Sequence, residues 1–347
     1  MALLRRLAIA SAIVFVLTSA ASAAAAPRSF YGVIAANDPD SSEIARMGAG
    51  NVGVLRINFV WAAVQPTEGA TYDWSHYDAI IGGAAQNGIR VLPTVYSSPS
   101  WAAQRDNYPP DKAHESAFRD FVAAAAARYG QNGTYWSTHP EVPKLPVVWW
   151  QFWNEANSPS FWYAKPNAKQ YVSLLRVFHD GIVSGDPSAK IALAGLFLTP
   201  QVKNGIYLDK FLPAIYRRGA KPLFDGAAVH PYSTTPAKAL DAVKQTRRIM
   251  LQFKDRKASL WVTEIGWASG GNKTPLTVSP QRQAAYLRKT FKLLAAKRGR
   301  LHIPGVIWYS LNDAPGTVWP AHCGLFTLDG RAKPSWDTFV ALTGGES

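Results

Sequence analysis

The stretch VVWWQFWNE, residues 147–155, is an apolar run of β-branched and aromatic side chains that ends in a carboxylate. A short apolar run of this composition is typical of a strand buried on both faces. An ionised glutamate at the end of such a strand is costly to bury unless it has a partner or a function, because burial removes its water. The position of Glu155 therefore predicts a strand whose end carries chemistry.

Further apolar runs with β-strand composition occur along the chain, and helical patterns separate them. They span residues 31–37, 52–61, 89–97, 189–197, 224–232, 259–267 and 304–313. Strands that are apolar throughout and alternate with helices are typical of a parallel sheet covered by helices. Together with residues 147–155 they predict an α/β fold, a closed (β/α)8 TIM barrel that forms a single domain over residues 27–347.

The helical patterns between these runs have apolar stripes that predict core-facing sides. The segment from Ala113 to Tyr129 has such a stripe and is followed by Gly130, and the segment from Pro280 to Arg300 has another. The sequence GAGNVG at 48–53 matches the glycine pattern of dinucleotide-binding proteins. A helical pattern precedes it and a strand follows, which reverses the order that such a site requires, so it predicts a turn.

The N-terminus predicts a secretory signal peptide over residues 1–26. Arg5 and Arg6 precede an apolar run to Leu17, and Ala21-Ser22-Ala23 forms a small-residue cleavage site. The alternative is a membrane anchor, but the apolar run is short and no other stretch is long enough to span a bilayer. We therefore expect a monomer secreted to the extracellular space or cell envelope, with no membrane insertion after signal cleavage.

The chain carries a formal net charge of +14. Much of the excess lies in the helical patterns KQTRRIMLQFKDRK (244–257) and LRKTFKLLAAKRGR (287–300), which predicts solvated outer helix faces. Attraction to an anionic polymer or cell surface is the functional alternative. No nucleic acid partner is expected, because the export signal separates the protein from it. Cys323 is the single cysteine, so no intramolecular disulfide can form.

Two glutamates stand out because they end predicted strands. Glu155 ends the fourth run, and Glu264 ends the apolar core of the seventh, in WVTEIGW. Active sites of (β/α)8 barrels lie at the carboxyl ends of the strands, and these two strands are nearly opposite each other in the ring. A facing carboxylate pair is what cleavage of a glycosidic bond requires. The alternative is two structural ion pairs, one of them with Arg56 at the second strand.

Several motifs resemble clan A glycoside hydrolases over essentially the whole mature chain. They are WNEAN at the fourth strand, TEIGW at the seventh, HPY at the sixth, RINFVW at the second, IWYS at the eighth, and VQPTEGATYDWSHYD at residues 64–78. Within that clan the sequence most resembles glycoside hydrolase family 39 or family 5. The resemblance implies a retaining O-glycoside hydrolase acting on a carbohydrate, an oligosaccharide or polysaccharide.

The same resemblance implies a role for each matching residue. Glu155 is expected as the general acid/base and Glu264 as the nucleophile. Arg56 and Tyr232 are expected to hold Glu264 ionised and aimed, and a nearby cation lowers a carboxyl pKa. Asn154 is expected to bond the sugar 2-hydroxyl. His230 is expected to line the same floor, and Trp308 to form the platform under the sugar being cleaved.

Tryptophans at or after strand ends predict sugar-binding surfaces, because the apolar C–H faces of sugar rings pack well on large flat side chains. Trp61, Trp101 and Trp267 are the further candidates for substrate binding. For any one of them core packing is the alternative.

No cofactor and no metal are expected, since the histidines include no H-E-x-x-H and no paired spacing. Three alternatives to the hydrolase remain open at this point: a transglycosylase that uses the same residues, a carbohydrate-binding barrel without turnover, and a basic surface adhesin.

Overall fold

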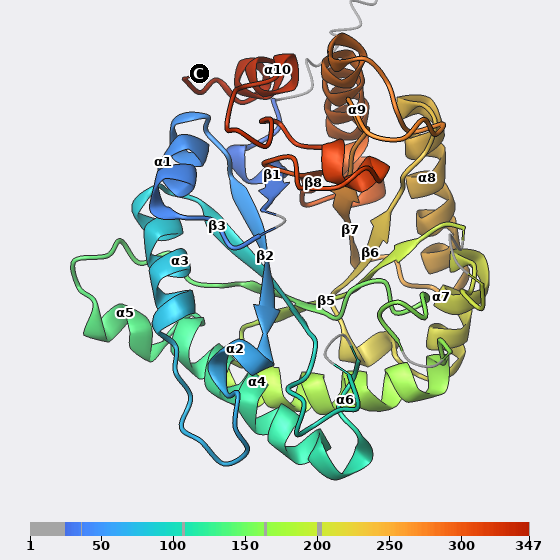
Figure 1. The fold of residues 1–347 in the computed structure, drawn as a ribbon. Helices are drawn as coiled ribbons and strands as arrows, with labels where there is room; N and C mark the ends of the chain where they lie inside the picture. The colour runs from blue at the N-terminus through green and yellow to red at the C-terminus, as the bar shows by residue number, and fades with distance from the viewer. Residues whose placement is uncertain (1–24, 36, 106–107, 163–164, 200–202, 347) are drawn as a thin grey trace, which may run out of the picture.

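The computed structural model describes residues 25–35, 37–105, 108–162, 165–199 and 203–346. Within these residues eight parallel strands form one closed barrel in chain order, with helices around it (Figure 1). The strands are β1 (Tyr31–Ile34), β2 (Val54–Val60), β3 (Arg90–Tyr96), β4 (Trp149–Phe152), β5 (Lys190–Phe197), β6 (Gly226–His230), β7 (Ser259–Ile265) and β8 (Val306–Tyr309). The predicted (β/α)8 TIM barrel in a single domain is confirmed.

The helices follow the strands and cover the outside of the barrel. They are α1 (Ser41–Ala49), α2 (Trp61–Val64), α3 (Ser75–Gln86), α4 (Glu115–Tyr129), α5 (Thr134–Thr138), α6 (Ala168–Gly185), α7 (Leu208–Arg217), α8 (Pro236–Gln252), α9 (Pro280–Leu301) and α10 (Pro334–Thr343), with short 3₁₀ turns at Arg28–Phe30, Lys112–His114, Lys221–Leu223 and Trp319–His322. The two helices expected at 113–129 and 280–300 are confirmed within two residues at each end.

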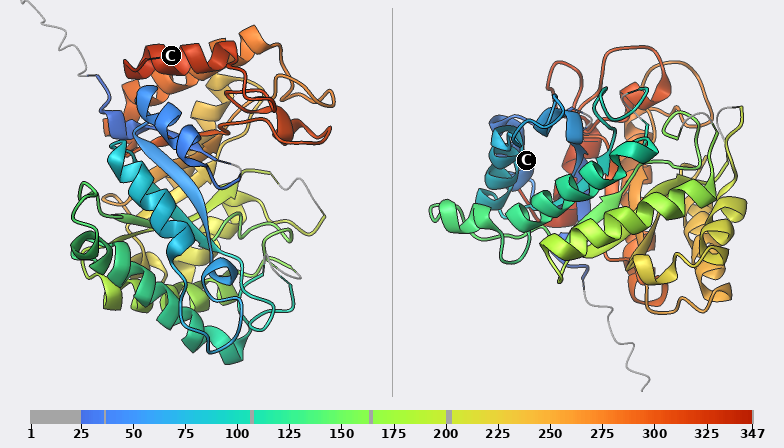
Figure 2. Two further views of the ribbon diagram at one scale, coloured as in Figure 1. Left: turned by 60° about the vertical axis from the view of Figure 1, so that its left-hand side comes forward. Right: turned by 90° about the horizontal axis from the view of Figure 1, so that it is seen from below.

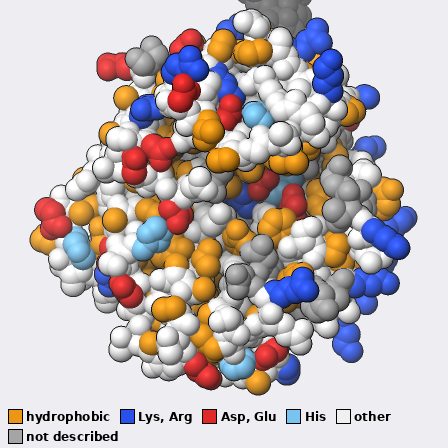
Figure 3. Space-filling view, in the orientation of Figure 1, with side chains coloured by type: hydrophobic (Ala, Val, Ile, Leu, Met, Phe, Trp, Pro, Cys, Tyr) orange, Lys and Arg blue, Asp and Glu red, His pale blue; other side chains and the backbone are white. Residues whose placement is uncertain are grey.

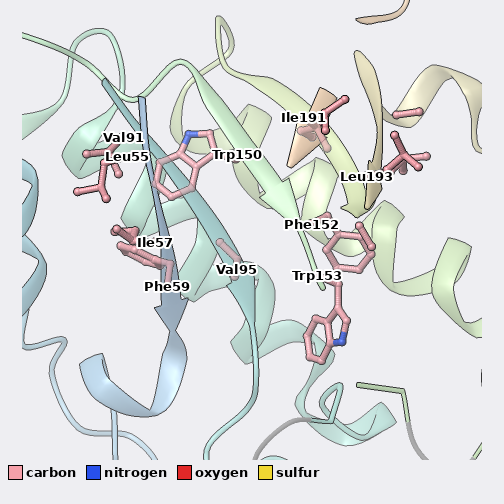
Figure 4. Close-up of a cluster of buried hydrophobic side chains, with 14 of the residues drawn as sticks. Leu55, Ile57, Phe59, Val91, Val95, Trp150, Phe152, Trp153, Ile191 and Leu193 are labelled. Carbon is pink, nitrogen blue, oxygen red and sulfur yellow. The ribbon is translucent and has the colours of Figure 1, made fainter. Parts of the chain in front are cut away.

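Alternation along the strands divides the side chains into two layers. Odd-numbered residues of β2 (Leu55, Ile57 and Phe59) belong to the large cluster between the barrel and the helices, where Figure 4 shows them with Trp150 and Phe152 of β4. The even-numbered Val54 belongs instead to the small cluster inside the barrel. This period of two follows from the pleat of a strand.

The barrel interior changes from apolar to polar towards the carboxyl ends of the strands. The apolar layer contains Val54, Leu92, Trp261 and Ile307. Two residues further along the same strands come Arg56, Thr94, Thr263 and Tyr309, and of these Arg56, Thr94 and Thr263 are at most 1% exposed. Each step of two keeps the side chain on the inner face, so the strand register itself builds a polar floor above the apolar layer.

The helices pack closely on one another and on the sheet. α4 and α6 lie side by side along one side of the molecule (Figure 2). A Cβ at Gly185 of α6 would lie 2.2 Å from the Ala123 carbonyl oxygen of α4. Glycine at this position therefore permits the close approach of the two helices.

The remaining sequence expectations can be placed in this fold. Residues 48–49 end α1 and residues 50–53 form the turn before β2, where Asn51 has a φ of 55°, so the prediction of a turn is confirmed. The predicted signal peptide lies outside the described residues except for residues 25–26. Among the described residues, no helix has the length and apolar character needed to cross a membrane. Cys323 is free and buried.

Basic side chains lie on the outer surface rather than in the core. Lys and Arg gather along the right-hand margin of the face in Figure 3, over the region of α7 and α8. Arg56, Arg247 and Lys333 are buried exceptions. Solvated helix faces therefore account for much of the excess positive charge.

Candidate active site

A cavity of about 760 Å3 opens at the carboxyl ends of the strands. Its volume lies within the range of small-ligand pockets. Figure 3 shows the hollow near the middle of that face, with acidic, basic and histidine side chains inside it. The charged and polar groups at its floor are Arg56, Asn154, Glu155, His230, Tyr232 and Glu264. The structure therefore brings together six of the residues singled out in the sequence, from strands far apart along the chain.

Glu264 lies inside the barrel near the end of β7, with its side chain only 10% exposed. Arg56 Nη1 donates to its Oε1 at 2.7 Å, and the Tyr232 hydroxyl donates to its Oε2 at 2.9 Å. Both carboxylate oxygens thus have a donor. Arg56 and Tyr232 therefore hold the Glu264 carboxylate in one orientation before any substrate binds.

The pKa of Glu264 is lowered from its ordinary value by the balance of opposing effects. Burial raises the pKa, but the neighbouring His230 and Arg56 lower it, and hydrogen bonds from Tyr232 and Arg56 lower it further. The lowering effects prevail, so the carboxylate stays ionised into the acid range. The expectation that a cation near Glu264 lowers its pKa agrees with this direction.

Arg56 is 1% exposed, and described groups accept hydrogen bonds from each of its three nitrogens. Beside the bond from Nη1 to Glu264, Nη2 donates to Asn154 Oδ1 at 2.8 Å. Nε donates to Gln151 Oε1, also at 2.8 Å. A buried guanidinium is tolerable only when its charge and donors are matched in this way. Arg56 therefore links the ends of β4 and β7 beneath the cavity.

Glu155 follows β4 in a segment whose backbone leaves the strand conformation. Trp153 and Glu155 have φ values of 68° and 36°, in the left-handed region that most residues avoid. Trp153 is held there by its backbone N–H on Val95 O at 2.9 Å and by its indole N–H on Phe161 O at 2.6 Å. Such strain costs about 1–3 kcal/mol per residue and concentrates at functional sites. Here the left-handed backbone directs the Glu155 side chain into the cavity.

His230 lies between the two glutamates. Its Nδ1 is 2.9 Å from Glu155 Oε1 and 3.5 Å from Glu264 Oε2, and its Nε2 is 3.1 Å from Thr263 Oγ1. Within the described residues, one ligand atom from each of Glu155, His230 and Glu264 lies within 4.8 Å of the others. Two carboxylates and an imidazole are a donor set for a divalent cation, a cluster that sequence spacing did not reveal. Beside Glu264, the guanidinium of Arg56 already supplies a positive charge that balances the carboxylate.

The tryptophan predictions need a correction. Trp61, Trp267 and Trp308 are 0% exposed and have no face on the cavity. Trp308 packs towards the helices because side chains alternate along β8, and Ile307 lies in the inner cluster. These three side chains are core residues in this structure, rather than sugar platforms.

Local contacts also explain why Trp61 and Trp267 are buried. Trp61 begins α2 and stacks on Phe121 of α4, with 5.6 Å between ring centroids. Trp267 donates its indole N–H to Ser233 O at 2.8 Å. Trp101 is partly exposed, but it packs edge-on against Trp61 and does not line the cavity at the glutamates. The aromatic side chains that do line it are Tyr96, Phe161, Phe197, Tyr232, Tyr309 and Trp319.

Sequence reasoning missed Gln151 and Tyr309. Gln151 is 0% exposed and joins the floor through Arg56. A polar residue inside the apolar run VVWWQFW was a signal, because period two places Gln151 on the same face as Trp149, which packs against the cluster inside the barrel. Tyr309 lines the cavity one residue beyond Trp308, and the alternation along IWYS was enough to choose between the two.

Fold and site together define a class: a (β/α)8 barrel with two carboxylates, an arginine, a histidine and a tyrosine at its mouth. Comparison with solved structures places this fold among those of family 39 and family 5 glycoside hydrolases. A family 39 glycoside hydrolase from Bacteroides cellulosilyticus WH2 aligns with 22% identity and a TM-score of 0.71, covering 92% of this chain. The chain spans 64% of the length of that protein.

Two further structures give the same result. A monomeric β-xylosidase from Caulobacter crescentus CB15 aligns with 16% identity and a TM-score of 0.68, over 94% of this chain and 70% of its own. A GH5_18 protein from Streptomyces cattleya, solved with Manβ1-4GlcNAc, aligns with 17% identity and a TM-score of 0.66, over 91% and 80%. No family model matches this sequence, and no curated protein matches it. At these identities the similarity establishes the fold.

Proposed function

We propose that this protein is a retaining glycoside hydrolase that cleaves a β-glycosidic bond in an oligosaccharide or polysaccharide. The observation that carries the proposal is the pair Glu155 and Glu264, which face one cavity with carboxylate oxygens within 4.8 Å of each other. Retaining enzymes hold their two carboxyl groups about 5–5.5 Å apart, whereas inverting enzymes leave about 6.5–9.5 Å for a water molecule. The short separation supports direct attack by one carboxylate.

The two glutamates have different surroundings, and these support different roles. Glu264 has a lowered pKa and donors on both oxygens, which suits an ionised nucleophile. The Glu155 side chain is 20% exposed, against 10% for Glu264, and its described side-chain partner is His230. It lies at the more open wall, where a leaving group departs and water enters. We therefore assign Glu155 as the acid/base.

The reaction then has two displacements at the anomeric carbon. Glu264 attacks this carbon, the bond to the leaving oxygen breaks, and Glu155 gives its proton to that oxygen. In the second step a water molecule attacks the same carbon, Glu155 takes a proton from the water, and the bond to Glu264 breaks. Arg56 and Tyr232 regain full hydrogen bonds to the carboxylate that is released. Atoms and protons balance, and Glu155 ends protonated again.

The substrate class is inferred from the cavity and from the similar structures. The similar proteins include a β-xylosidase and one solved with a β1-4-linked disaccharide, which supports a β-linked carbohydrate. Tyr309 is the candidate platform for the sugar being cleaved, because it lines the cavity beside Tyr232. Asn154 lines the same cavity. Its Oδ1 accepts from Arg56, which leaves its NH2 group as a donor for a sugar hydroxyl.

Export remains part of this proposal. Arg5, Arg6 and the apolar run to Leu17 support a cleaved signal peptide and a secreted monomer. N-terminal sequencing of protein recovered from culture medium tests this point. A mature protein that begins near residue 27 is expected, and an uncleaved, membrane-bound protein would contradict it.

A screen with one variant tests the activity itself. Aryl β-glycosides and plant and bacterial polysaccharides are incubated with wild-type protein and with Glu264→Gln, which keeps the side-chain size but removes the nucleophile. Hydrolysis by the wild type and near-complete loss in a folded Glu264→Gln protein are expected. Wild-type rates from that variant would overturn the assignment. Product sizing separates hydrolysis from sugar transfer.

A further inference from the structure

A chain of buried hydrogen bonds runs from Arg56 to His230 beneath the proposed catalytic pair. Its members Gln151 and Thr263 are 0% exposed. Neither lines the cavity, so neither touches a substrate there. The chain is therefore a candidate for positioning rather than for chemistry.

The side-chain amide of Gln151 has only one workable orientation. Its Oε1 accepts from Arg56 Nε at 2.8 Å and from Thr94 Oγ1 at 3.0 Å. A guanidinium has donors and no acceptor, so the atom facing Arg56 must be the oxygen. The Gln151 NH2 group then faces Leu193 O at 3.3 Å and Thr263 Oγ1 at 3.4 Å. Leu193 O accepts only, which fixes the same orientation from the other side.

The orientation of Gln151 determines what Thr263 does. Among the described residues, the Thr263 hydroxyl has two side-chain partners, Gln151 Nε2 and His230 Nε2. Gln151 Nε2 donates to it, so the single hydroxyl proton of Thr263 is left for His230 Nε2 at 3.1 Å. An Nε2–H on His230 would make the threonine oxygen accept from both residues, and the threonine proton would then have no acceptor among the described side chains.

The other ring nitrogen leads to the same assignment. His230 Nδ1 faces Glu155 Oε1 at 2.9 Å and Glu264 Oε2 at 3.5 Å. An ionised carboxylate accepts only, so a proton on Nδ1 satisfies this side of the ring. In a neutral imidazole the bond made by one nitrogen sets the protonation of the other.

Gly195 provides the space for this arrangement. A Cβ built there would lie 1.9 Å from His230 Nε2 and 2.6 Å from Thr263 Oγ1. A side chain on β5 would therefore occupy the position of the hydrogen bond between the two residues. Glycine at this point keeps the ring of His230 against the threonine hydroxyl.

We infer that Gln151 and Thr263 are positioning residues that hold His230 in the neutral form with its proton on Nδ1, shared between Glu155 and Glu264. The ring then serves as a fixed donor to whichever glutamate is ionised. It also keeps the two carboxyl groups at one separation through both displacements. This consequence for catalysis rests on the proposed function, whereas the protonation state of the ring does not.

The direct test is NMR of the full mature chain labelled with 15N in its histidine rings. Long-range 1H–15N spectra near pH 7 distinguish Nδ1–H, Nε2–H and the doubly protonated ring, and the signal lost in His230→Gln identifies the residue. A single Nδ1–H form is expected. An Nε2–H or doubly protonated ring in the wild type would overturn the inference, whatever the enzyme activity proves to be.

Variants at Thr263 test whether its hydroxyl determines which nitrogen of His230 is protonated. Thr263→Ser keeps the hydroxyl and should keep the Nδ1–H signal. Thr263→Val removes it and should give a mixture of ring forms, with kcat/KM lower by about 10- to 100-fold, the usual effect of losing a partner that orients a site residue. Thr246→Val removes another buried threonine hydroxyl, which bonds Ala242 O within α8, and is the matched control. An unchanged ring signal in folded Thr263→Val would contradict the inference.

Gln151→Glu provides a second, independent arm. The introduced carboxylate still accepts from Arg56, but it accepts from Thr263 instead of donating to it. Thr263 then turns its proton away from His230, and the ring should take an Nε2–H. A wild-type ring signal in folded Gln151→Glu would show that Gln151 does not set the tautomer.

Discussion

Arg56 and Glu264, which are 208 residues apart in the sequence, form a buried ion pair with 2.7 Å between Nη1 and Oε1. The arginine comes from β2 and the glutamate from β7, so the closed barrel alone brings them together. Burying both charges is tolerated because each has further hydrogen-bond partners. The pair places the carboxylate and keeps it ionised.

Arg56→Lys is expected to lower activity although the positive charge remains. A single ammonium cannot reproduce the three directed bonds to Glu264, Asn154 and Gln151. Hydrogen bonds to charged groups contribute about 1.5–3 kcal/mol each, so a loss of about 10- to 100-fold in kcat/KM is expected. Steady-state kinetics on an aryl glycoside measure it. Arg128→Lys, at a half-buried pair with Asp78 outside the cavity, is the control, and equal effects of the two changes would count against this role.

The acid limb of the pH profile should lie below the ordinary glutamate range. The pKa of Glu264 is lowered, so the nucleophile stays ionised below about pH 4.3, where an unperturbed glutamate takes up its proton. The same pairing stabilises the folded state above that pH, and this stabilisation is lost as the pH falls through the folded-state pKa. The profile of kcat/KM against pH measures the limb.

Tyr232→Phe should move that acid limb upward. The change removes a hydrogen bond that lowers the pKa of Glu264. Tyr216→Phe removes a buried tyrosine hydroxyl that bonds Asp255 elsewhere in the fold, and should leave the limb in place. A limb that stays fixed in folded Tyr232→Phe would mean that Glu264 does not control it.

Glu155→Ala should affect substrates according to their leaving groups. Natural glycosides need a proton from the acid and should lose far more rate than aryl glycosides with activated leaving groups. Azide should restore turnover on the activated substrate, because a small anion fits the vacated space and attacks without a base. Equal losses on both substrates without azide rescue would exclude Glu155 as the acid/base.

Trp308 and Tyr309 are neighbours with different expected roles. Trp308→Ala should destabilise the fold by about 3–5 kcal/mol, as expected for a buried tryptophan. Tyr309→Ala should raise KM with a smaller loss of stability, because Tyr309 lines the cavity. Denaturant unfolding and kinetics on the same preparations separate the two effects. A Trp308→Ala protein with wild-type stability and poor substrate binding would restore tryptophan as the platform.

The sequence predicted the barrel and the charged floor because both depend on patterns along single strands. Alternating apolar runs and helices are sufficient for the (β/α)8 fold, and Glu155 and Glu264 were identified as residues that end strands. Position within a strand also determines which face a side chain occupies. Applied to β8, this rule separates Tyr309 from Trp308, whereas the family resemblance had assigned the platform to Trp308.

Other features depend on contacts that no single strand contains. His230 contacts Glu155, which follows β4, and Thr263 and Glu264 of β7, and its position needs the missing Cβ of Gly195. The turn at Trp153 and Glu155 needs φ values that sequence patterns do not favour for these residue types. Tertiary contacts hold this turn, so the sequence alone could not predict the direction of the Glu155 side chain.

The anomeric configuration of the first product tests the central claim most directly. Attack by Glu264 and then by water inverts the anomeric carbon twice, so a β-glycoside should release a β-sugar first. Proton NMR of a fresh digest, read before mutarotation, measures this, and the short distance between the glutamate oxygens, within 4.8 Å, predicts retention. An α-configured initial product would contradict the nucleophile role of Glu264, even if both glutamates proved essential.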